Sequence, residues 1–280
     1  MLSLELLPAL FIGGTLTATS IGITVRVLAD LKRQNATEGQ IVLGAAVMDD
    51  ILGVVLLALL YEFVIGGGVS ITNAGKVLVF IWIFFMLATP AAKLLSLLIR
   101  RFYADAEIPG LIPTSSVGVG VCFGGLSRAG GAPELLGGFA AGLALSRRFF
   151  LPVGIAIRTD VYFAKSVEEQ MKPIIHLFTP IFFVMVGLSL SLHEIDWSSP
   201  FIWTFSISMT FIAILGKFIG ALLIRESWYT RMIIGMAMVP RGEVGLIFAE
   251  LGRVSGVLNN EVYAGMVMAV SYTHLRAHET

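Results

Sequence analysis

Two adjacent carboxylates, Asp49 and Asp50, lie within the apolar run Gly44–Gly53. A charged side chain at the centre of a membrane helix costs about 2.5–3.5 kcal/mol on insertion scales, so a buried pair indicates a use. Neighbours on a helix point about 100° apart, so one acid can face a water-filled cavity while the other meets a cation. Desolvation and mutual repulsion oppose a doubly charged pair, which suits exchange of a proton for a cation. The alternative is a structural ion pair at a helix end.

The run Gly13–Ser20, in the middle of the first apolar segment, contains two glycines and four hydroxyl residues. These residue types weaken a helix and offer the backbone other hydrogen bonds. A helix broken at mid-membrane exposes carbonyl oxygens, which together with the hydroxyls can replace part of an ion's hydration shell. The candidates here are Thr17 and Ser20. The alternative is a continuous helix whose hydroxyls bond to carbonyls four residues back.

A second interruption is expected at Val239–Gly245, where Pro240 removes a backbone donor and two glycines flank it. Arg241 and Glu243 within this run form either a local compensating pair or part of a gate. Lys217 lies in another apolar segment, near its end. Either it extends to the membrane surface, or it pairs with one of the two aspartates, a role that suits lysine because its charge is easily changed by burial.

Lipid must surround the elements that carry these residues. The 280-residue chain has a mean hydropathy of +0.88 and is 14% charged, against roughly 25% in soluble domains. Segments long enough to cross a membrane are expected near 4–27, 40–63, 76–99, 112–127, 133–150, 173–192, 200–224 and 231–251, with a partial ninth from about 261. The formal net charge is zero, so nothing indicates a nucleic-acid partner.

The connections between these segments predict the orientation of the chain. Twelve lysines and arginines lie in the odd-numbered connections and three in the even-numbered ones. The odd connections are therefore expected in the cytoplasm, with the first segment running inward and the eighth outward. Two interrupted helices of opposite orientation are the mark of an inverted-repeat transporter.

Residues 1–270 are expected to form a partial transmembrane domain, in which 1–63 is one core half, 76–150 the intervening helices and 173–270 the second half. The tail 271–280 interrupts the last apolar run with two histidines, an arginine and a glutamate. It is expected to be non-native, and no function is assigned to it.

Six stretches in this order carry a resemblance to a known family: TATSIGITVRVL (17–28), EGQIVLGAAVMDDILG (38–53), FAAGLALS (139–146), TPIFFVMVGLSLSL (179–192), LGKFIGALL (215–223) and PRGEVGLIFAELG (240–252). Over residues 1–270 the chain resembles the membrane domain of the second monovalent cation:proton antiporter family, the Kef- and Nap-type sodium or potassium/proton exchangers. The ordered set is more specific than any one motif.

The resemblance implies an all-α membrane fold of inverted repeats with two crossed discontinuous helices. About eight complete transmembrane helices and a partial ninth are expected, so the chain would be truncated at both ends. The family forms homodimers, and a homodimer of the full-length parent is implied.

The resemblance also implies roles for the candidate residues. Asp50 is the main proton- and cation-binding carboxylate, and Asp49 pairs with Lys217. The hydroxyl residues lie by the first unwound stretch, and Arg241 and Glu243 lie by the second. No metal is expected beyond the transported Na⁺ or K⁺ at Asp50, and no cofactor is expected.

These residues lead us to expect exchange of monovalent cations for protons across a bacterial plasma membrane, by a multi-pass protein in contact with lipid. A cation channel, or an inactive fragment serving only as a membrane subunit, is the alternative. An enzyme is not expected. An intramembrane aspartyl protease needs two carboxylates sharing one proton, whereas Asp49 and Asp50 diverge on one helix.

Overall fold

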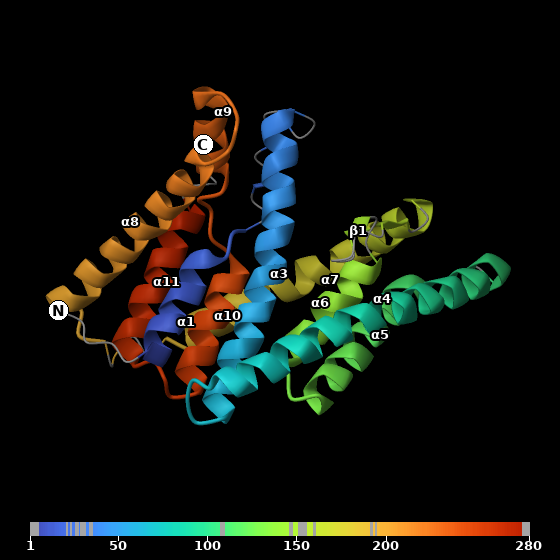
Figure 1. The fold of residues 1–280 in the computed structure, drawn as a ribbon, viewed down its shortest axis with the longest axis horizontal. Coiled ribbons are helices and arrows are strands. Elements are labelled where there is room, and N and C mark those ends of the chain that lie inside the picture. The colour runs from blue at the N-terminus through green and yellow to red at the C-terminus, as the bar shows by residue number, and fades with distance from the viewer. Residues whose placement is uncertain are drawn as a thin grey trace. The chain divides into compact units, whose positions relative to one another are not determined.

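The structure is a computed structural model, shown in Figure 1. It describes residues 6–20, 22, 24–25, 28, 32–33, 36–106, 110–145, 148–150, 156–158, 161–190, 193 and 195–275. The described chain is predominantly helical, as the composition predicts. It also contains one short antiparallel pair of strands, β1 (Arg148–Phe150) and β2 (Ala156–Arg158). The segment that was expected to reach residue 150 leaves its helix at Leu145, before this strand pair.

The chain divides into two compact units. The first comprises Met1–Leu60 and Met185–Thr280, and so joins the two ends of the sequence. Its helices are α1 (Leu6–Thr17), most of α3 (Thr37–Ile65), α8 (Pro200–Leu222), α9 (Trp228–Ala237), α10 (Glu243–Val254) and α11 (Asn260–Leu275). Within it α1 packs on α10, α10 on α11, α11 on α8, and α8 on α9 (Figure 1).

Local sequence signals explain where two of these helices begin. Ser199 caps α8, its hydroxyl accepting a hydrogen bond from the amide of Phe201, and Pro200 occupies the first turn, where no N–H is needed. Ser227 caps α9 in the same way by accepting from the amide of Thr230. Apolar side chains then hold these helices in the first unit, in a cluster formed by Leu28, Val42, Ala221, Ile234 and Met238.

Glycines allow α1 and α10 to approach closely. A Cβ added at Gly14 would lie 2.6 Å from the Phe248 ring, and one at Gly245 would lie 3.1 Å from the carbonyl oxygen of Thr15. Phe248 itself is fully buried. Small residues at such a contact permit the tight packing on which helix association in lipid depends.

The second unit comprises Tyr61–Val184. It contains α4 (Ile71–Ala106), α5 (Leu111–Ala129), α6 (Glu134–Leu145), the strand pair and most of α7 (Val161–Leu188). Here α4, α5 and α6 pack together, and α7 begins well before the residue 173 that the sequence suggested. Much of the expected connection 151–172 is therefore helical.

Three helices in the described residues are long and apolar enough to cross a membrane, at Thr37–Ile65, Lys165–Leu188 and Pro200–Leu222. Large apolar side chains along α7 are exposed: Ile175, Leu177, Phe178, Ile181, Val184, Met185 and Leu188. Together these features indicate an integral membrane protein. The first and eighth expected segments are shorter as helices because each is interrupted. In addition, α11 continues to Leu275, so the helix extends into the expected tail, residues 271–280.

Candidate ion-exchange site

The first interruption follows α1. That helix ends at Thr17, and residues 18–20 are not helical. Inside α1, the hydroxyl of Thr15 donates to the carbonyl of Phe11 at 3.1 Å, and the hydroxyl of Thr17 donates to that of Gly14 at 2.8 Å. The expected break is therefore present and the alternative of a continuous helix is wrong, although hydroxyls within α1 do bond to carbonyls of the preceding turn.

The second interruption separates α9 from α10. The eighth expected segment is two helices, the first ending at Ala237 and the second beginning at Glu243, with residues 239–242 outside any helix. Pro240 explains the break, because it has no N–H to continue the helical hydrogen bonds. The predicted break at this motif is present.

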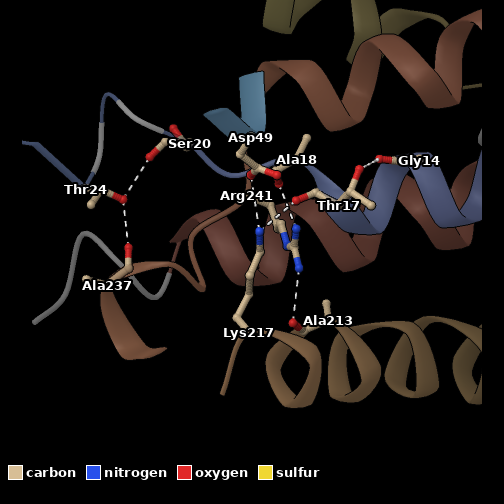
Figure 2. Close-up of polar contacts among 10 residues, drawn as sticks. All are labelled: Gly14, Thr17, Ala18, Ser20, Thr24, Asp49, Ala213, Lys217, Ala237 and Arg241. Atoms are coloured by element: carbon tan, nitrogen blue, oxygen red, sulfur yellow. Dashed lines mark hydrogen bonds and ion pairs between the residues drawn. The ribbon is translucent and has the colours of Figure 1, made fainter. Parts of the chain in front are cut away.

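The two interruptions contact each other. The amide of Ser20 donates to the carbonyl of Pro240 at 2.9 Å. The hydroxyl of Thr24 lies 2.8 Å from the carbonyl oxygen of Ala237 and 3.0 Å from that of Ser20 (Figure 2). A Cβ at Gly242 would lie 2.8 Å from both Cβ and Oγ of Ser20, so only glycine fits there without displacement.

Lys217, on α8, links this meeting point to α3. Its Nζ lies 3.2 Å from Oδ2 of Asp49 and donates to the carbonyl of Thr17 at 2.9 Å. The Lys217 and Asp49 side chains are each 18% exposed. The lysine therefore points to the acid pair and does not extend towards the end of its helix.

Arg241 binds to the same end of α1. Its guanidinium donates to the carbonyl oxygens of Ala18, at 2.8 Å, and Ala213, at 3.1 Å, and the residue is 2% exposed (Figure 2). The last carbonyls of a helix lack intrahelical donors and carry the negative end of its dipole, so cations are favourable there. The carbonyls of Thr17 and Ala18 thus have cationic partners. Each carbonyl oxygen has a second lone pair, so a role of this stretch in binding the transported ion stays a prediction.

A cavity of about 320 Å³ adjoins the ion pair. Its lining residues are Leu16, Thr17, Asp49, Ile212, Ala213, Gly216, Lys217 and Arg241. This volume holds several water molecules. The cavity therefore gives water or a partly hydrated cation room beside the aspartate, although its walls also carry two fixed positive charges.

Asp50 is differently placed from its neighbour. It is partly exposed, and it interacts electrostatically with Asp49 and with Glu243. Within the described residues it forms no hydrogen bond or ion pair, and it is absent from the cavity lining. Glu243 is exposed and opens α10. The structure thus brings Asp49, Lys217, Thr17 and Arg241 together, whereas Asp50 lies outside the cavity lining.

Three residues at this site were missed from the sequence. Thr19 is 3% exposed, and its hydroxyl has no hydrogen-bond partner among the described residues. It lies within the recognised hydroxyl run, which could have identified it. The contacts of Thr24 with Ala237 and of Gly242 with Ser20 could not be found in this way, because each joins residues more than two hundred positions apart in the sequence.

One acidic residue outside the site, Glu134, has a local partner. Glu134 pairs with Arg128 at 2.8 Å across the α5–α6 connection, with both side chains exposed. Apart from the Lys217–Asp49 pair, the ion pairs among the described residues link residues that are close in sequence. No group of three or more His, Cys, Asp or Glu side chains in the described residues could hold a metal ion.

Comparison with known proteins places these features in a family. Residues 1–276 match the family described as sodium/hydrogen exchanger, transmembrane. The high-affinity Na⁺/H⁺ antiporter NhaS3 of Synechocystis is 34% identical, over 95% of this chain and 56% of its own length. The Na⁺/H⁺-K⁺ antiporter GerN of Bacillus cereus is 32% identical (95% and 65%), and an Na⁺/H⁺ antiporter of Enterococcus hirae is 30% identical (94% and 65%).

The chain spans between about half and two thirds of the length of these curated relatives. The matched region contains both helix interruptions, the acid pair and the lysine. This protein therefore belongs to the family of transmembrane sodium/hydrogen exchangers.

Proposed function

We propose that the whole protein exchanges Na⁺ or K⁺ for protons across a membrane, at a site formed by Asp49 and Asp50. One observation carries the proposal: two adjacent acids on α3 lie where two interrupted helices meet, and among the described residues only Asp49 of the two has a cationic partner, at 3.2 Å. The names of the relatives, which are Na⁺/H⁺ and Na⁺/H⁺-K⁺ antiporters, support exchange and leave both cations open.

Asp50 binds either the proton or the dehydrated cation in this proposal. Because the Lys217 ammonium already compensates Asp49, a second negative charge at Asp50 is the one that requires neutralisation. Mutually exclusive occupancy of one carboxylate couples the two fluxes without covalent chemistry. Ser20 and Glu243 are the candidate neighbours of the bound ion, while Thr17 contributes less, since its hydroxyl and carbonyl are both engaged.

The positively charged residues set the electrostatic background of the site. Lys217 and Arg241 compensate the helix end and Asp49. When a cation or proton neutralises Asp50, the acid pair and the lysine together carry no net charge, so less charge must cross the apolar part of the membrane. This supports alternating access, in which the helices that carry the site move only when it is neutralised.

The two interruptions support an inverted-repeat fold with crossed discontinuous helices. Their non-helical segments are joined by the Ser20–Pro240 hydrogen bond, and α1 packs on α10. Irregular backbone at membrane depth is tolerated where protein or a cavity surrounds it. A homodimer, a bacterial plasma membrane location and the absence of a cofactor complete the proposal.

The test is proton flux in vesicles containing the whole protein, with Na⁺, K⁺ and Li⁺ added in turn. Asp50→Asn is expected to abolish cation-driven proton movement. Glu62→Gln, which removes a carboxylate from the same helix well away from the site, is the matched control and is expected to retain it. If the Asp50→Asn protein still exchanges cations for protons, Asp50 is not the ion- and proton-binding residue. Cation flux without proton movement in the wild type would indicate a channel.

A further inference from the structure

We infer that Thr24, in the helical residues that follow the first interruption, is a positioning residue that caps α9 and so holds the two breaks in register. It does not touch the acid pair. Its effect is to fix the non-helical segment 239–242, and with it Arg241, against the end of α1. The consequence for ion exchange rests on the proposed function, whereas the cap itself does not.

The carbonyl of Ala237 needs a donor from elsewhere. It is the last residue of α9, and a continuing helix would satisfy it with the N–H of residue 240 or 241. Residue 240 is proline and has no N–H, and the backbone leaves the helix after Met238. The Thr24 hydroxyl supplies a donor 2.8 Å away, across 213 residues of sequence.

The geometry indicates which acceptor the hydroxyl serves. A hydroxyl has one proton, and both nearby oxygens are carbonyl acceptors that cannot donate. The carbonyl of Ser20, at 3.0 Å, already accepts from the amide of Thr24 at 3.3 Å. The hydroxyl therefore donates its proton to the carbonyl oxygen of Ala237, which is the nearer of the two acceptors. Thr24 is 2% exposed, so water does not readily replace it.

A second hydrogen bond fixes the position of the first break relative to the second. The amide of Ser20 donates to the carbonyl of Pro240 at 2.9 Å. Thus the two donors are Ser20 N–H, in the first break, and Thr24 O–H, in the helical residues that follow it. The two acceptors are the carbonyls of Pro240 and Ala237, one on each side of residues 238 and 239. Two hydrogen bonds between these segments restrict both rotation and sliding of one segment past the other, whereas a single hydrogen bond would permit rotation.

The test compares Thr24→Val, which keeps the shape and removes the hydroxyl, with Thr24→Ser, which keeps the hydroxyl. Amide hydrogen–deuterium exchange is followed in the purified full chain, in peptides covering the two breaks and in peptides from α8 and α11. We expect Thr24→Val to accelerate exchange about threefold to tenfold at the breaks alone, and Thr24→Ser to match the wild type. Thr210→Val is the matched control, because that hydroxyl donates at 2.9 Å to Ser206 within its own helix. It should leave both breaks unchanged.

Unchanged exchange at the breaks in Thr24→Val would overturn the inference. So would uniform acceleration through α8 and α11, because it would show a general loss of stability in place of a local tie. These readouts require no transport, so they stand even if the protein proves not to exchange ions. If it does, Thr24→Val should lower the maximal exchange rate and Thr24→Ser should restore it.

Discussion

Gly242→Ala tests whether the two interruptions are in contact as closely as the structure shows. The backbone at Gly242 is extended, with φ −146° and ψ −153°, so alanine meets no conformational penalty there. The new Cβ, however, would lie 2.8 Å from Cβ and Oγ of Ser20, against about 3.5–4.0 Å for an ordinary carbon–carbon contact. One break must therefore move by about 1 Å.

That movement has two costs. Overpacking a tight contact costs about 1–3 kcal/mol, and weakening the 2.9 Å bond from Ser20 N–H to Pro240 adds about 0.5–1.5 kcal/mol. We expect a total of about 1.5–4.5 kcal/mol. At about 2–4 °C per kcal/mol, the unfolding temperature should fall by roughly 3–18 °C.

The assay is thermal unfolding of the purified protein, with a suppressor and a control. Ser20→Gly removes both atoms that clash, so the double variant should recover at least about 1 kcal/mol relative to the sum of the single changes. Gly220→Ala, in α8, meets nothing within 4 Å and should leave the unfolding temperature unchanged or raise it. The close approach is refuted if Gly242→Ala has the same unfolding temperature as the wild type, or if adding Ser20→Gly to Gly242→Ala does not restore stability.

Three further changes probe the packing and the charges. Lys217→Met leaves the aspartate without its cation and should cost about 3–5 kcal/mol by thermal unfolding, whereas a lysine in solvent would cost nothing measurable. Gly14→Ala should destabilise the protein by about 1–3 kcal/mol, because the new methyl group would meet the buried ring of Phe248 in α10. Gly13→Ala meets nothing within 4 Å and should not destabilise the protein, so equal effects would contradict the close packing of these helices. Tyr263→Phe removes the 2.7 Å bond to Glu250 and should cost about 1 kcal/mol in the same measurement, so an unchanged unfolding temperature would show that water replaces it.

The sequence by itself determined the solvent of this protein and the location of its charges. Long apolar runs with few charged residues require lipid, whatever the tertiary structure. Pro240 predicted its helix break from covalent geometry alone, since a residue without an N–H cannot continue the hydrogen-bond ladder. The adjacent acids Asp49 and Asp50 could be predicted as a candidate site, because burial of charge at mid-membrane is costly in any fold.

Element boundaries were less well predicted. The hydrophobic pattern does not separate α6 from the strand pair that follows, nor does it show that α7 begins at Val161. Apolar content reports only contact with lipid or core, and a helix can continue into a polar stretch without changing that pattern. Short caps and turns decide such limits locally.

Only the tertiary structure decided which groups meet. The sequence proposed that Lys217 pairs with an aspartate, but the additional bond from its ammonium to the carbonyl of Thr17 depends on how α8 packs beside α1. In the same way, Arg241 binds Ala18, and Thr24 reaches Ala237, across more than two hundred residues. Carbonyl oxygens are present in every residue, so composition cannot show which are occupied. Their partners are set by the contact between two helix ends, and that contact exists only in the folded chain.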